Sequence, residues 1–161
     1  MMRQRAATSR RRLFIAWRIA WTLLTLITVE ALVCALSIMP VVLAWHWLQN
    51  IVPPSPAVRL FVWSASIVPS YIAFALCLMV IAPGAARLAG WHTPADAHLR
   101  IADMDWPVLK WVRYGASLHL VRVVAGSLFG GTPVWTAHLR LSGAEMRKRV
   151  YVHRLSVGDY N

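Results

Sequence analysis

Charged residues are missing from two long stretches of this sequence. Residues 61–86 contain no charged side chain, and Arg87 is the first one after them. Residues 13–40 contain only two charged side chains, those of Arg18 and Glu30. Each stretch exceeds the roughly 20 residues that a helix needs to cross about 30 Å of hydrocarbon. Because 58% of all residues are hydrophobic, the composition argues against an ordinary soluble domain and indicates a membrane protein.

Cysteine is also scarce. The chain has two cysteines, Cys34 and Cys77, and both lie inside apolar stretches. Thiols in such surroundings usually pack as inert apolar residues. We therefore expect neither a disulfide nor a cysteine metal site.

Basic residues are nearly absent from the short connector between the two apolar stretches. The formal net charge is +11, yet residues 49–58 carry no arginine and Arg59 stands alone at their edge. This asymmetry predicts a multi-pass protein of the inner (cytoplasmic) membrane with both termini in the cytoplasm. The amino-terminal arginines, including Arg10, Arg11 and Arg12, are expected to contact anionic lipid, and nucleic acid is not an expected partner.

The pattern of apolar and polar residues predicts a mostly α-helical membrane protein. Five segments succeed one another: a basic arm at 1–12, a transmembrane hairpin at 13–88, a cytoplasmic loop at 89–105, an interfacial amphipathic helix at 106–129 and a short β-prone segment at 130–161. We expect the arm to be disordered or to lie on lipid head groups.

The hairpin is predicted to contain two spans, at 13–39 with a possible extension to 48, and at 57–82. Pro40 should bend or end the first span, and Pro83 with Gly84 should end the second. The first apolar stretch continues well past its cluster of small residues, which favours an uncleaved anchor over a signal peptide.

Several side chains of the first span suit a membrane environment. Trp17 and Trp21 lie on one helical face next to Arg18, which is typical of an anchor at the lipid interface. Glu30 is the one acid inside a predicted span, and such a carboxyl is costly unless it is paired or protonated. It is either in polar contact with Thr25, Thr28 or a neighbouring helix, or a neutral acid tolerated by the bundle.

The third apolar region, 106–129, is more polar than the first two. Lys110, Arg113 and Ser117 recur at helical spacing on one face. An interfacial helix with Lys110 and Arg113 facing water is therefore predicted, and a third transmembrane helix is the alternative.

The histidines outside the hairpin show no spacing typical of a metal-ligand set. We interpret each as a surface or interfacial residue, so no catalytic residue, metal site or cofactor is predicted: His92, His98, His119, His138 and His153.

The last third carries three motifs: Gly131-Thr132-Pro133-Val134-Trp135, then Leu139-Arg140-Leu141-Ser142-Gly143-Ala144, then Val150-Tyr151-Val152. Together with the closing residues 155–161 they resemble the entry into a membrane-associated left-handed β-helix. The resemblance is to the C-terminal region of poly-ε-lysine-synthetase-like nonribosomal peptide synthetases and their stand-alone relatives, which carry hexapeptide-repeat acyltransferase-like domains. Met146-Arg147 departs from this pattern, where the family has an Ile-Gly step.

The resemblance implies a membrane-anchoring module of an acyltransferase-like or peptide-synthetase-associated protein, non-enzymatic alone. Its partners would be the bilayer and a hexapeptide-repeat domain or carrier-linked synthetase. Because the repeat coils are absent, the chain is interpreted as a truncated member or as one whose coils come from another chain. Two alternatives stay open: a subunit that completes such an acyltransferase in trans, and a small two-span membrane-interaction or pore-forming protein.

Overall fold

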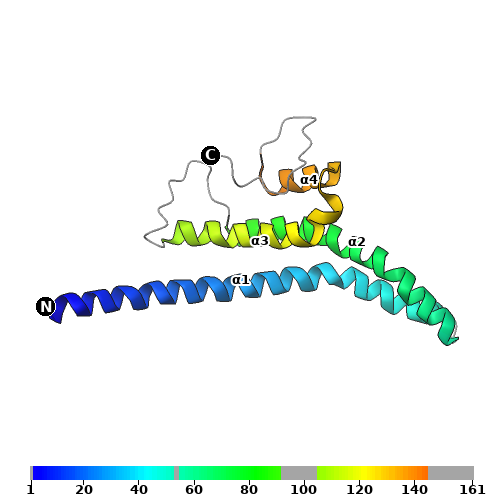
Figure 1. Cartoon of the computed structure of the whole chain (residues 1–161), viewed down its shortest axis with the longest axis horizontal. Helices are drawn as coiled ribbons and strands as arrows, with labels where there is room; N and C mark the ends of the chain where they lie inside the picture. Colours follow the sequence, from blue (N-terminus) through cyan, green and yellow to red (C-terminus); the bar gives the residue numbers. More distant parts are fainter. Residues whose placement is uncertain (1, 53–54, 92–104, 145–161) are drawn as a thin grey trace.

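The computed structural model of the chain describes residues 2–52, 55–91 and 105–144, with side chains from Leu13 onward. These residues form four helices and no strand: α1 (Met2–Ile51), α2 (Pro56–Leu88), α3 (Trp106–Phe129) and α4 (Pro133–Leu141). Figure 1 shows α1 and α2 as a long antiparallel hairpin, with α3 and α4 on one side of it. The prediction of a mostly helical chain built on two long apolar helices is confirmed.

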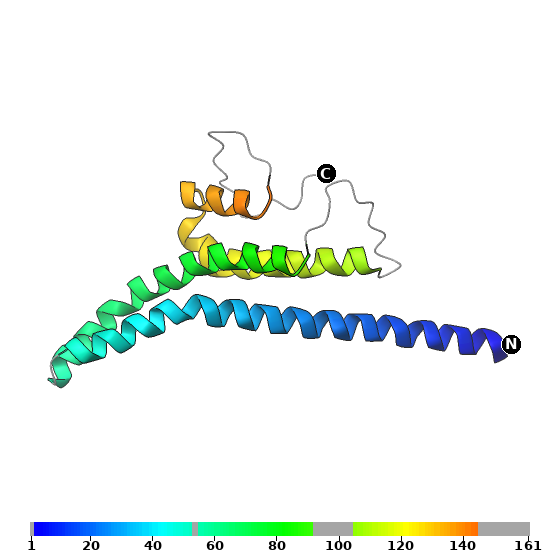
Figure 2. The same ribbon diagram turned by 180° about the vertical axis from the view of Figure 1, so that it is seen from behind.

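Helix α1 is longer at both ends than the sequence pattern predicted. It begins at Met2 instead of near Leu13, so the backbone of the basic arm is helical and the expectation of a disordered arm is wrong. The alternative, an arm that lies on lipid head groups, stays a prediction. Arginine, glutamine and alanine, which dominate this arm, all favour helix. At the other end the helix passes through Pro40 and continues to Ile51, with a bend in its cyan part (Figure 2).

Helix α2 also passes through the residues that were expected to end it. The predicted span was 57–82, but Pro83 and Gly84 lie inside a helix of 33 residues. The true stop is Gly90, which has φ of 66° and so takes the left-handed conformation that suits glycine. The amides of Gly90 and Trp91 bond back to carbonyls of the last turn and close a Schellman motif.

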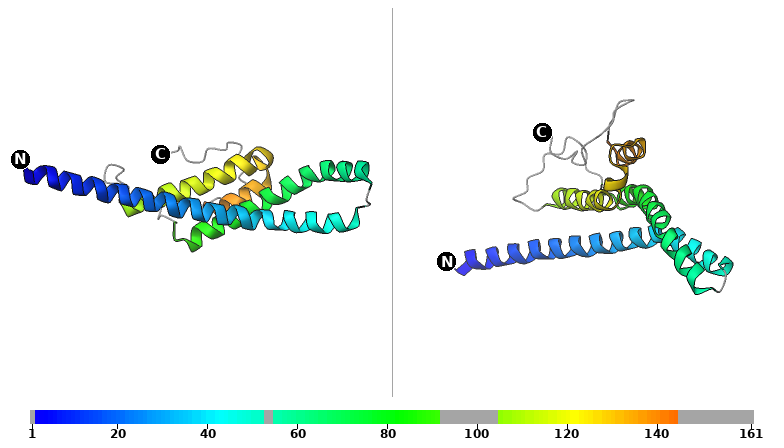
Figure 3. Two further views of the ribbon diagram at one scale, coloured as in Figure 1. Left: turned by 90° about the horizontal axis from the view of Figure 1, so that it is seen from below. Right: turned by 45° about the vertical axis from the view of Figure 1, so that its right-hand side comes forward.

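Helix α3 has the bounds predicted from the sequence. It runs lengthwise beside α1 and α2, as the different views in Figures 1 and 3 show. At its start Asp105 bonds to Arg18 of α1, and near its end the Tyr71 hydroxyl of α2 donates to the Val124 carbonyl at 2.6 Å. Helix α3 is therefore the third helix of a bundle.

The core lies where all four helices meet. Small residues of α2 and α3, such as Ala75, Ala82 and Ala125, allow the two helices to approach closely. Val33 from α1 and two residues of α4, Trp135 and Leu139, complete the buried cluster. Beyond this core the hairpin tip consists of α1 and α2 alone (Figure 1).

Two helices are long and apolar enough to cross a membrane, over 13–51 and 56–88. In the most apolar 18-residue segment of each helix, only 11% of the residues of the first and 22% of those of the second are buried inside the protein. Most of their large hydrophobic side chains therefore lie on the outside of the bundle, which is unusual for core helices of a soluble protein.

The segment predicted as a β-helix entry is helical where it is described. Residues 130–144 form a turn, α4 and a second turn, and no strand occurs in them. The β-prone run Val150-Tyr151-Val152 lies outside the described residues.

Candidate functional site

The amino-terminal end of α4 is built by the Gly-Thr-Pro motif. Gly131 takes φ of 78°, which turns the chain out of α3. Thr132 is the N-cap: its hydroxyl accepts from the Trp135 amide at 3.3 Å and donates to the Phe129 carbonyl at 2.6 Å. Pro133 comes next, at the first helical position, where a missing N–H costs nothing.

The carboxyl-terminal end of α4 is built by the Ser-Gly-Ala motif. Gly143 takes φ of 96° and donates from its amide to the Arg140 carbonyl at 3.0 Å. The Ala144 amide donates to the Leu139 carbonyl, also at 3.0 Å. These two bonds form a Schellman motif with glycine in its usual place. The residues that carry the family resemblance therefore cap a short helix at both ends.

Three side-chain hydrogen bonds hold α4 against α2 and α3. His138 of α4 donates from Nδ1 to the Met79 carbonyl of α2 at 2.8 Å. The Arg87 guanidinium of α2 donates to the Leu141 carbonyl, and the Tyr114 hydroxyl of α3 donates to the Ser142 carbonyl. These last two acceptors belong to the end of α4, where carbonyls lack helical partners. We call this set of contacts the α4 dock.

Proline explains why the Met79 carbonyl is free to accept the bond from His138. In a regular helix this carbonyl would accept from the amide of residue 83, but Pro83 has no N–H. A carbonyl can only accept, so Nδ1 of His138 carries the proton. Burial lowers the pKa of His138, which the bond to Met79 raises in part. The prediction that His138 is a surface residue is wrong, since its side chain is 2% exposed.

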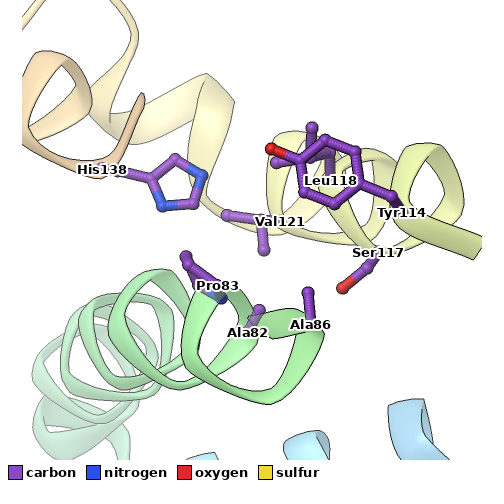
Figure 4. A pocket seen from close by; sticks show the side chains of 8 residues that line it. All are labelled: Ala82, Pro83, Ala86, Tyr114, Ser117, Leu118, Val121 and His138. Carbon is purple, nitrogen blue, oxygen red and sulfur yellow. The ribbon is translucent and has the colours of Figure 1, made fainter. Parts of the chain in front are cut away.

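A small cavity lies between α2, α3 and α4 beside the dock. Figure 4 shows the His138 ring and the Tyr114 ring facing it from opposite sides, with Pro83 and Val121 between them. Its volume is about 10 Å³, which is room for one water molecule at most. Burial raises the pKa of Tyr114, while the nearby Arg87 lowers it in part. The cavity is therefore a packing gap and not a substrate pocket.

A second polar region, which we call the α1–α3 seam, starts at the first turn of α3. Arg18 pairs with Asp105 at 3.2 Å and lies over the Phe14 ring at 4.4 Å. The Trp106 ring lies 5.6 Å from the Arg18 guanidinium and 6.0 Å from that of Arg113. Arg18 thus connects α1 with the start of α3. The contact of Arg18 with lipid stays a prediction.

Arg113 lies deeper in the same seam. Its side chain is 7% exposed, so the prediction that it faces water is wrong. It donates to the Thr22 hydroxyl at 3.1 Å, and among the described residues no carboxylate pairs with it. Its helical spacing placed it on one face with Ser117, but the bundle buries both side chains.

Glu30 lies further along the seam without a hydrogen-bond partner. Both carboxyl oxygens are buried and none of the described residues bonds to them, although the Ser117 hydroxyl faces the group. Thr25 and Thr28, which were candidate partners, donate to carbonyls of their own helix. Thr25 and Thr28 are thus excluded as partners of Glu30, whereas a contact with the neighbouring helix, through Ser117, and a neutral acid tolerated by the bundle both stay predictions.

The other predicted membrane-contact residues lie on the surface where they are described. Trp17 and Trp21 stack with ring centroids 6.3 Å apart and are 64% and 45% exposed. Lys110 is exposed, as predicted. The side chains of Arg10, Arg11 and Arg12 lie outside the described residues, as do His92, His98 and His153.

No family model, no curated protein and no solved structure matches this chain.

Proposed function

We propose that the chain is a membrane-anchoring module, non-enzymatic by itself, which holds the segment after α4 at the cytoplasmic face of a bilayer. The α4 dock is the observation that carries this proposal. It fixes the last described turn of the chain to the hairpin by the contacts of His138, Arg87 and Tyr114. A flexible tether would need no such attachment, whereas an anchor that orients the segment after α4 requires one.

The surface of the hairpin supports a position inside a bilayer. Large apolar side chains such as Leu24, Ile27 and Leu36 are about half exposed or more on the outside of α1. Exposure of this extent is stable in lipid and unstable in water. Arginines concentrate at both chain ends of the hairpin, which favours a cytoplasmic location for both termini at the inner membrane.

Helix α3 has two different faces, which support an edge position in the bundle. Arg113 and Ser117 face the hairpin, while Lys110, His119 and Arg122 are partly or fully exposed. Three polar side chains on the outer face are poorly suited to acyl chains. We infer that this face meets water, head groups or protein, and that α1 and α2 are the spanning helices.

The link to an acyltransferase-like or peptide-synthetase body stays a proposal that rests on the resemblance alone. Thr132, Pro133 and Gly143 are explained by helix capping, so they require no β-helix. A capped helix at this place is nevertheless a suitable rigid connection to a further domain. A catalytic role for the chain alone finds no support in the small cavity at the dock.

Topology reporters test the anchoring proposal directly. Fusions at residues 55 and 95 should report opposite sides of the membrane, and the full chain should resist alkaline carbonate extraction. In hydrogen exchange, the amides of Ser142, Gly143 and Ala144 should be protected, because all three are bonded to carbonyls of α4. Fusions on the same side, or acyl-CoA turnover by the purified chain, would overturn the proposal.

A further inference from the structure

Arg59 is an isolated cation at the tip of the hairpin. It lies exposed in the first turns of α2, and no described residue forms an ion pair or hydrogen bond with its side chain. The sequence contains no Asp or Glu between Glu30 and Asp96. The neutralising charge for Arg59 must therefore come from outside this part of the chain.

A polar pocket surrounds this arginine. Its volume is about 410 Å³, and its lining combines the end of α1 with the start of α2: Gln49, Asn50, Val52, Arg59 and Trp63. The guanidinium offers a planar fork of N–H donors, and the two amides offer further donors. A pocket rich in donors and lined by no carboxylate suits a phosphate oxygen.

Tryptophans place this pocket near a membrane surface. Trp45 stacks on Trp63 with centroids 6.4 Å apart, and its indole donates to the Ser70 hydroxyl at 3.0 Å. Trp47 is 66% exposed on the same tip. Indoles concentrate at the level of lipid head groups. The tip, with Arg59, therefore lies at the interface opposite to the one that holds Arg18.

We propose that the pocket binds the phosphate of an anionic phospholipid in the leaflet at the hairpin tip. Arg59 pairs with the phosphate oxygens, and the amides of Gln49 and Asn50 donate to them or to the polar head. A zwitterionic lipid fits less well because it carries its own cation. This inference rests on the proposed position of the hairpin in a membrane.

The test compares the full wild-type chain with Arg59→Gln in phosphatidylcholine nanodiscs containing increasing phosphatidylglycerol. Native mass spectrometry of the released protein counts the phosphatidylglycerol molecules that it retains. Loss of one guanidinium should weaken retention about fivefold. Arg59→Lys, which keeps the charge but loses the fork, should give an intermediate value. The matched control is Arg122→Gln on α3, which removes the same charge outside the pocket and should lower retention clearly less than Arg59→Gln does; an equal loss would contradict a specific site at Arg59.

Each outcome separates this site from the anchoring proposal. Equal retention by wild type and Arg59→Gln, with both proteins resistant to carbonate extraction, would overturn the lipid site and leave the anchor intact. Failure of the wild type to enter membranes would overturn the anchor itself. Displacement of the lipid by millimolar inorganic phosphate would show that a soluble anion is the ligand, which contradicts the lipid assignment.

Discussion

His138 of α4 donates a hydrogen bond to the Met79 carbonyl of α2, which Pro83 leaves without its helical donor. The hydrogen bond that α2 lacks at the Met79 carbonyl is thus supplied by a side chain 59 residues later in the chain. The pair explains both why α2 continues through proline and why α4 lies where it does.

A double-mutant cycle can test this relationship. His138→Ala should destabilise the protein by about 2 kcal/mol, because it leaves the buried Met79 carbonyl unpaired. In Pro83→Ala with His138→Ala, the new amide at residue 83 can bond to Met79, so about 1 kcal/mol should return. Denaturant unfolding in detergent micelles measures both values. His119→Ala, on the outer face of α3, is the control and should change the free energy of unfolding little. If the effects of Pro83→Ala and His138→Ala were strictly additive, residue 83 and His138 would not share the Met79 carbonyl.

Acid should loosen the α4 dock. Burial lowers the pKa of His138 in the folded protein below its ordinary value near 6.5. The stabilisation is therefore present above pH 6.5 and is lost as the pH falls from there toward the folded pKa. Hydrogen exchange at Ser142 and Gly143, corrected for intrinsic rates, should accelerate as the pH falls below about 6.5. The same profile in His138→Asn would show that another group titrates.

Arg113 should be replaceable by an apolar residue of similar length. It is buried with one hydroxyl partner and, in the described part of the chain, no carboxylate partner. Arg113→Met should leave thermal stability unchanged or raised, because removal of a poorly paired buried charge is often favourable. Arg113→Ala should cost about 2 kcal/mol through lost packing. A loss for methionine as large as that for alanine would mean that the charge itself stabilises the seam.

The caps of α4 should respond individually to substitution. Gly143→Ala places a Cβ at φ of 96° and should cost about 1 kcal/mol. Thr132→Ala removes the N-cap and should also cost about 1 kcal/mol, whereas Thr132→Ser keeps the hydroxyl. Protection of the α4 amides against exchange is the measurement. Loss of protection in Thr132→Ser equal to that in Thr132→Ala would rule out the capping role.

Local pattern was enough to predict the helical class and the bounds of α3. The apolar run from Trp106 to Phe129 is preceded by Asp105 and followed by Gly130-Gly131, so its ends are marked in the sequence. The carboxyl-terminal end of α2 was misplaced because Pro83 was expected to end the helix. Pro40 was expected to bend or end α1, and the helix continues past it to Ile51, three residues beyond the possible extension to 48. A proline removes one donor, and packing against neighbouring helices can compensate for one lost bond.

The buried positions of Arg113 and His138 could not be predicted from their own segments. Periodicity shows that residues share a face, but it does not show which element packs against that face. The caps of α4, however, could be predicted from the sequence. The helix has nine residues and is enclosed by Thr132-Pro133 at its start and Ser142-Gly143 at its end, which are residues typical of helix ends. The family resemblance drew the interpretation of these residues toward a β-helix instead.

The α4 dock also has a consequence for the order in which the protein is made. Every group that receives α4, namely the Met79 carbonyl, Arg87 and Tyr114, precedes it in the chain. A ribosome therefore delivers the complete receiving surface before it delivers the helix that occupies it, and domains tend to fold in that direction during synthesis. Helix α4 can join a hairpin that has already formed, and no earlier element has to wait for it or be displaced by it.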